Sequence, residues 1–153
     1  VTNTSVNVDL EEVKFGFAKD APLAEVVAGD WGEAGKNGGN LVLNAEQQHL
    51  EGDIVVDAIS SVKFDMGSKV TYKGAINPNK QGTAVVVMDK TSKWTLAADS
   101  YLESIQFEKT VEKGIKQINS KGYNIYYNPK NPANAVLGGK TYSLKGGGLL
   151  LTY

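Results

Sequence analysis

Short apolar runs separated by turn residues constrain this chain more than any other feature of its sequence. The runs are rich in β-branched and aromatic residues, and Gly, Asn, Asp, Ser and Pro stand between them. Within one run, Val62, Phe64 and Met66 alternate with Lys63 and Asp65, which is the two-residue period of a half-buried strand. Few windows keep a helical period. The pattern therefore predicts an all-β fold.

The expected strands share this composition and this punctuation by turn residues. They cover residues 6–10, 13–17, 23–27, 41–43, 54–56, 62–66, 70–72, 84–88, 94–96, 101–107, 123–127, 141–144 and 149–152. Only residues 108–119 favour a helical turn, and the pattern there is weak.

A repeat in the sequence separates two candidate all-β architectures. Three groups of residues recur about 31–32 positions later, a period typical of repeat folds. Ile54-Val55-Val56, Val62-x-Phe64 and Gly67-Ser68-x-Val70 return as Val85-Val86-Val87, Trp94-x-Leu96 and Asp99-Ser100-x-Leu102. Stacked coils of a β-solenoid, with three short strands per coil and long corner loops, explain such a repeat. A Greek-key sandwich shares the strands and turns but has no reason to repeat.

Several stretches resemble the repeats of right-handed parallel β-helix proteins of the bacterial secreted or cell-surface adhesin type, a non-catalytic branch of the pectin-lyase-like fold. They are Asp30–Gly32, Gly52–Val62, Tyr72–Asn77, Ser92–Leu102, Ile118–Tyr123 and Leu137–Tyr142. The match covers most of the chain from about residue 30 onward. The resemblance implies one right-handed β-helix domain over residues 1–153. It also implies an exported location and an adhesive or glycan-binding role, and it names no ligand.

Composition restricts the partners. The chain of 153 residues has 16 basic residues, all of them lysine, and 17 acidic ones, which give a formal net charge of −1. A near-neutral chain lacks the positive surface that nucleic acid requires. No apolar run reaches the roughly 18 residues of a membrane span, so we expect no membrane insertion. The first residues, Val1–Ser5, show neither a signal peptide nor an initiator Met. We therefore expect a mature, secreted or cell-surface form, which can be a segment of a longer protein.

The missing arginine argues against catalysis. Resemblance to pectate lyases would imply an arginine beside acidic groups, and resemblance to polygalacturonases an arginine and lysine with a histidine near several aspartates. Lysine supplies only a point charge in place of the planar fork. His49 is the only histidine, and no Gly-x-Ser-x-Gly pattern accompanies it. We therefore expect no enzyme activity, with a polysaccharide lyase or hydrolase kept as a second alternative.

The glycine-rich segment 29–40 is the best candidate binding loop. Trp31 offers a ring, and Asp30, Asn37 and Asn40 offer the polar groups that bind a sugar. The simpler interpretation is that Trp31 folds back over an apolar edge. Tyr126 is a further candidate, because the strand period places it opposite Ile125 and Tyr127. These residues carry the first alternative function, a carbohydrate-binding module for plant or host polysaccharide, with a glycan or host surface as partner.

No metal or cofactor is expected. Asp53 and Asp57 share one strand face but lie about 13 Å apart along it, too far for one metal ion. They are better explained as strand-terminating residues that bond nearby backbone. His49 alone makes no zinc site. Exposed solenoid ends leave sheet edges open, which predicts self-association end to end. The main expectation is a non-catalytic, structural or adhesive β-helix domain.

Overall fold

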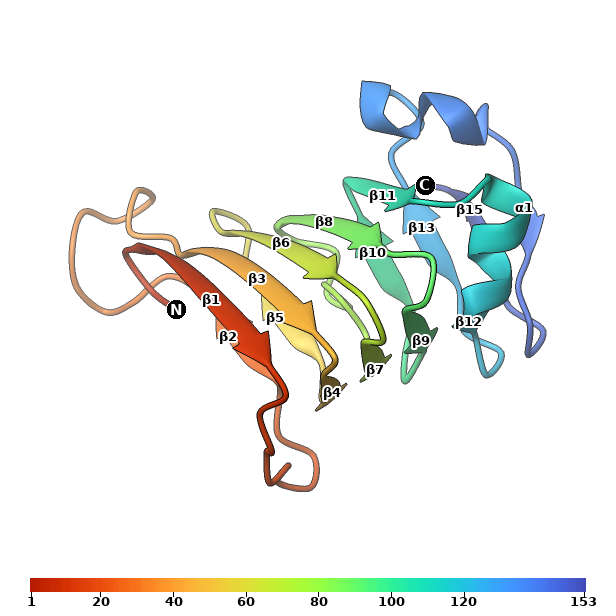
Figure 1. The fold of residues 1–153 in the computed structure, drawn as a ribbon. Helices are drawn as coiled ribbons and strands as arrows, with labels where there is room; N and C mark the ends of the chain where they lie inside the picture. The colour runs from red at the N-terminus through yellow and green to blue at the C-terminus, as the bar shows by residue number, and fades with distance from the viewer.

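Fifteen strands form four sheets in the computed structural model, which describes residues 1–153 (Figure 1). Strands hold 40% of the residues and helices 8%, so the predicted all-β class is confirmed. The sheet orders are β1-β3-β6-β8-β11, β12-β9-β7-β4, β10-β13-β15-β14 and β2-β5. Every strand pair is parallel except β14 with β15.

The strands are short, as the spacing of turn residues predicts. Their bounds are β1 (Ser5–Glu11), β2 (Ala24–Val26), β3 (Asn40–Glu46), β4 (His49–Glu51), β5 (Ile54–Val56), β6 (Ser61–Met66), β7 (Thr71–Lys73), β8 (Thr83–Met88), β9 (Lys93–Thr95), β10 (Ser100–Leu102), β11 (Ser104–Phe107), β12 (Ile118–Asn119), β13 (Ile125–Tyr127), β14 (Tyr142–Ser143) and β15 (Leu149–Thr152). The helical pieces are α1 (Val111–Gly114) and the 3-10 turns η1 (Ile115–Gln117) and η2 (Pro132–Leu137).

The register of the sheets corrects the predicted repeat. Leu41 pairs with Val62 and Val62 with Ala84, steps of 21 and 22 residues, and the step from Trp94 to Ile118 is 24. The spacing of 31–32 residues is therefore wrong. Ile54–Val56 is β5, whereas Val85–Val87 lies in β8 of a different sheet. The two runs also alternate in opposite phase, because Ile54 and Val56 are buried in β5 whereas only Val86 is buried in Val85–Val87. Their similar composition therefore does not indicate register.

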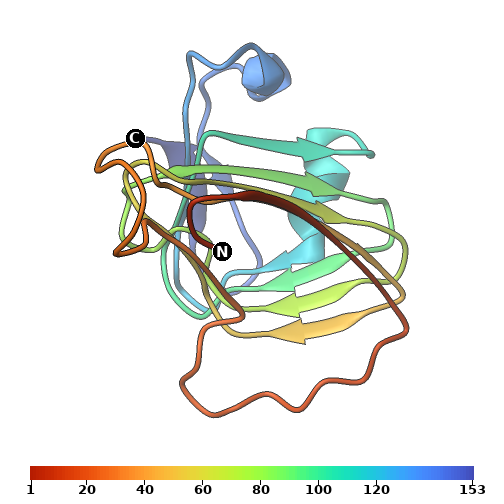
Figure 2. The same cartoon turned by 90° about the vertical axis from the view of Figure 1, so that its left-hand side faces the viewer.

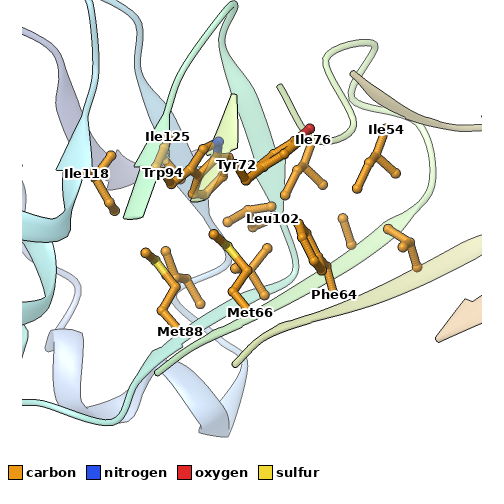
Figure 3. Close-up of a cluster of buried hydrophobic side chains, with 14 of the residues drawn as sticks. Ile54, Phe64, Met66, Tyr72, Ile76, Met88, Trp94, Leu102, Ile118 and Ile125 are labelled. Carbon is orange, nitrogen blue, oxygen red and sulfur yellow. The ribbon is translucent and has the colours of Figure 1, made fainter. Parts of the chain in front are cut away.

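Alternation along the strands builds the core. The Tyr72 ring meets Phe64 edge-on at 5.3 Å and lies 6.0 Å from the Trp94 ring, all three inside the stack of strands (Figure 3). The polar atoms of these rings are paired: the Tyr72 hydroxyl donates to Gly52 O and Trp94 Nε1 donates to Gly74 O, at 2.9 and 2.8 Å. Burial raises the pKa of Tyr72 well above its ordinary value. The interior thus tolerates aromatic polar groups because neighbouring backbone satisfies them.

Some predicted strands are wrong. Residues 13–17 form no strand, since the N–H and C=O of Val13 bond the Gln48 side chain at 2.8 and 2.6 Å and Phe15 and Phe17 stay exposed. Residues 101–107 split at Glu103 into β10 and β11, which belong to different sheets. The predicted helical turn within residues 108–119 is confirmed by α1 and η1.

Some elements have no sequence signal. Strand β4 has one apolar residue, Leu50, and β12 has only two residues. The turn η2 was also not expected. Asn131 caps it, and its Oδ1 accepts a hydrogen bond from Ala133 N at 2.9 Å.

The two ends of the stack differ (Figures 1 and 2). At the N-terminal end, which faces the viewer in Figure 2, β1 pairs with β3 alone and its other edge has no partner strand. Val8 and Leu10 are only half-buried there, and with Phe15 and Leu23 they line an apolar hollow of about 360 Å³. At the C-terminal end, β14 covers the edge of β15 and η2 lies against β11 (Figure 1). None of the helices has the length and apolar character to span a membrane.

Candidate functional site

The loop between β2 and β3 holds Trp31 outward. The Trp31 side chain is 60% exposed, so the interpretation that it caps an apolar edge is wrong. Buried Asn37 shapes the loop, because its Nδ2 donates to Gly29 O at 2.6 Å and to Trp31 O at 3.0 Å. The amide donors of Asn37 are thus used within the chain.

The other predicted sugar contacts do not converge on Trp31. Asp30 is exposed, but Asn40 lies in β3, where its Oδ1 accepts from Ser61 Oγ at 2.7 Å and its Nδ2 donates to Ser5 Oγ at 3.3 Å. Asn40 therefore belongs to a ladder of polar residues on the outer face of that sheet.

Tyr126 lies on the outward side of β13, as the strand period predicts. Its ring stacks on Tyr101 of β10, with centroids 4.7 Å apart and an interplanar angle of 6°. The Lys80 Nζ lies 5.4 Å from the Tyr101 centroid and 5.1 Å from that of Tyr153. On sequence grounds the outward tyrosine face is expected to pack on a loop in preference to binding a glycan flatly. One face of the Tyr126 ring is indeed covered, but by Tyr101 of the neighbouring strand β10. The loop that carries Trp31 and strand β13 lie toward opposite ends of the molecule (Figure 1).

Asp53 and Asp57 both accept hydrogen bonds from backbone, and the predicted bond to local backbone is confirmed for Asp57 but not for Asp53, whose partner is 22 residues away. Asp53 Oδ1 accepts from Ala75 N at 2.7 Å, and Asp57 accepts from Ala28 N at 2.6 Å and Ile59 N at 3.2 Å. No three acidic or histidine side chains come together as metal ligands.

His49 sits on the exposed face of β4. Its Nε2 lies 2.9 Å from Glu51 Oε1 and its Nδ1 2.8 Å from Thr71 Oγ1. The hydrogen bond from His49 lowers the pKa of Glu51, and the Lys73 charge adds to this effect. The sequence around His49 predicts a solvated loop position. The residue is exposed as predicted, but it belongs to strand β4 and not to a loop.

A second hollow, which the sequence did not indicate, is lined by six of the lysines. It has a volume of about 610 Å³ and lies between the α1–η1 segment and the outward faces of β9 and β12, which are neighbours in Figure 1. We call it the lysine groove. The lysines that line it are Lys90, Lys93, Lys109, Lys113, Lys116 and Lys145.

Strand register assembles one wall of the lysine groove. Thr95 of β9 pairs with Asn119 of β12, and Asn119 forms a parallel bridge with Lys145. These three outward residues stand side by side on adjacent strands, although they are far apart in the sequence. Lys93 precedes Thr95 by two residues and shares its face.

The α1–η1 segment forms the other wall. Lys109, Lys113 and Lys116 follow the spacing of one helix face. Gln117 fixes this wall to the preceding loop, because its Nε2 donates to Asp89 O at 2.8 Å and to Ser92 O at 2.6 Å. The groove is thus held by hydrogen bonds between its walls.

The charge in the lysine groove is largely unpaired. Among the six lysines only Lys90 has a carboxylate within 4.0 Å, Glu108 Oε1 at 3.5 Å. No acidic residue lines the groove, and the nearby Glu112 of α1 is exposed without an ion pair. A concave surface lined by one sign of charge concentrates ligands of the opposite sign. The arrangement can therefore hold an anion.

The sequence held a partial signal for this site. Lys109, Lys113 and Lys116 recur at helical spacing, which marks one positive face. Lys93, in contrast, is expected from sequence to be a solvated strand residue, and nothing in the sequence connects it with Lys145. Comparison with known proteins finds no matching family, no matching curated protein and no matching solved structure.

Proposed function

We propose that this chain is a right-handed parallel β-helix and serves as a non-catalytic, adhesive domain of an exported bacterial surface or secreted protein. The order of strands supports the β-helix. The pairs β3-β4, β6-β7, β8-β9 and β11-β12 each pass from the first sheet to the second. The chain then enters β5 of the two-stranded sheet, Ile76, which bridges Ile54 of β5, or β10 and β13 of the third sheet. This order supports the proposal of three short strands per coil. Right-handedness is the strong preference of parallel crossover connections.

The lysine groove is the observation that carries the adhesive role. Five lysines without ion pairs line its two walls, in a chain whose net charge is −1. Their mutual repulsion costs stability and is relieved when an anionic surface binds. We therefore propose that the domain attaches to negatively charged surfaces by this groove.

Retention on a sulfonate cation exchanger at pH 7 tests the adhesive proposal. A protein of net charge −1 is retained only if a local patch controls binding, so the expected result is retention that is lost in Lys93→Gln/Lys113→Gln/Lys116→Gln. The control is Lys14→Gln/Lys19→Gln/Lys36→Gln, which changes net charge equally at the N-terminal end and should still be retained. Equal loss from both variants would overturn the proposal.

The two alternatives have their own tests. A glycan site at Trp31 is favoured only by the exposure of that ring, and it predicts that Trp31→Ala reduces retention on a glycan array. A lyase or hydrolase predicts product release from polygalacturonate at high protein loading. We further propose that any self-association uses the uncovered N-terminal end, because the C-terminal sheet edges at β15 and β11 are covered.

A further inference from the structure

We infer that the lysine groove binds an acidic polysaccharide, whose anionic groups meet the lysines while its hydroxyl groups meet Thr95 and Asn119. This inference rests on the proposed adhesive function and names the ligand class of the same site. The inference depends on the lysines and also on the neutral hydrogen-bonding side chains that lie between them.

Neutral hydrogen-bonding groups separate the lysines on the strand wall of the groove. Thr95 and Asn119 lie between Lys93 and Lys145. The Thr95 hydroxyl and Asn119 Nδ2 donate no hydrogen bond within the chain, whereas Asn119 Oδ1 accepts from Lys121 N at 3.4 Å. A ligand that leaves these donors unpaired gives up their binding free energy. A polymer with both anionic groups and hydroxyls satisfies the whole wall.

The groove is poorly suited to nucleic acid. Trp94 is the only aromatic residue that lines it, and its ring is fully buried with Nε1 bonded to Gly74 O, so no ring face is free for base stacking. No arginine is present to form bidentate contacts with phosphate or guanine. The chemistry therefore favours sugar hydroxyls over bases between the anionic groups.

Lysine does not discriminate between carboxylate and sulfate by geometry, because an ammonium group is a point charge. The groove should therefore accept both uronate and sulfated polysaccharides, with affinity that follows charge density. Affinity should also fall steeply with salt, because binding releases counterions.

The test measures binding of the full chain to polygalacturonate, heparin and a single-stranded DNA oligonucleotide at several salt concentrations. Lys113→Gln/Lys116→Gln should weaken all three and reduce the salt slope by about one per lysine removed. Thr95→Val/Asn119→Ala should weaken both polysaccharides by roughly tenfold, the effect of losing two modest hydrogen bonds, and leave DNA binding unchanged. Thr83→Ala, on the outward face of β8 in another sheet, is the matched control and should change nothing.

The outcomes separate this inference from the proposed function. Retention on the cation exchanger without polysaccharide binding, or equal loss of DNA and polysaccharide in Thr95→Val/Asn119→Ala, overturns the inference and leaves the adhesive proposal standing. If the wild-type chain is not retained on the cation exchanger, both the inference and the adhesive proposal are overturned. Unfolding midpoints of each variant confirm that a loss of binding is not a loss of fold.

Discussion

The two ends of the molecule are both built from short, mostly parallel strands. They differ in net charge and in whether their outermost strand edges are covered by other elements. Residues 1–35 contain seven acidic residues and two lysines, whereas residues 104–153 contain seven lysines and two acidic residues. The N-terminal end leaves β1 unpaired on one edge, and the C-terminal end is covered by β14 and η2. The near-neutral total therefore hides a strong separation of charge along the stack. Net charge alone gives a misleading picture of what such a chain can bind.

The largest predicted effect compares one substitution at both ends. Leu150→Ala in β15 should lower the free energy of unfolding by about 2–5 kcal/mol, because Leu150 is fully buried. Leu10→Ala in β1 should cost about 1 kcal/mol or less, because half-buried Leu10 already loses part of its contacts to solvent. Urea unfolding measures both. Equal costs would mean that the N-terminal end is covered in solution.

The apolar hollow at the N-terminal end gives a second prediction. A dye that fluoresces on apolar surfaces should bind the folded chain, and the average mass measured by sedimentation should rise with protein concentration. Leu10→Gln should reduce both, because Leu10 lines the hollow. Val136→Gln is a suitable control, since Val136 is the most exposed large apolar side chain and lies in η2 at the other end. If Val136→Gln reduced dye binding and association more than Leu10→Gln, the self-associating apolar surface would lie at the C-terminal end.

Acid should destabilise the N-terminal strands through protonation of Asp57. Partial burial raises the pKa of Asp57, but hydrogen bonds from Ser60 and from the amides of Ala28 and Ile59 outweigh it and hold the pKa below its ordinary value. Asp57 therefore contributes stability above the pKa of an unfolded aspartate, and this contribution is lost as pH falls through the lower folded pKa.

Asp57→Asn should remove that part of the pH dependence. Unfolding midpoints of wild type and variant should differ most near neutral pH and approach each other in acid. Gaps of the same size at all pH values would show that the charge of Asp57 is not what matters.

The smallest expected effect concerns Trp31. Because its side chain is largely exposed, Trp31→Ala should change the free energy of unfolding by no more than about 0.5 kcal/mol. It should also leave polyanion binding in the lysine groove unchanged, since the Trp31 loop and the groove lie toward opposite ends. Weakened binding of heparin by this variant would move the binding site to the N-terminal end.

Sequence patterns predicted the positions of strands better than they predicted which strands pair with each other. The alternation of Val62, Phe64 and Met66 identified β6 correctly, because burial on one side imposes a period of two on any strand. Register was not predictable in the same way, since the β-branched runs of β5 and β8 have a composition that suits a strand in either of their two sheets. Strand β4, with Leu50 as its one apolar residue, has too little pattern to be found.

The candidate site was only partly visible from sequence for the same reason. Trp31 is conspicuous in the sequence, yet its predicted partner Asn40 belongs to a separate polar ladder. The lysine groove depends on Thr95, Asn119 and Lys145 meeting through parallel pairing, which only the register brings about.

The parallel pairing also has a mechanical consequence. Backbone hydrogen bonds between neighbouring parallel strands point along the direction in which the strands stack. A pull applied between a ligand in the lysine groove and the N-terminal end would stretch the bonds of several sheets at the same time. Rupture would then require many bonds to fail together, so the stack would behave as a stiff tether for whatever the groove holds.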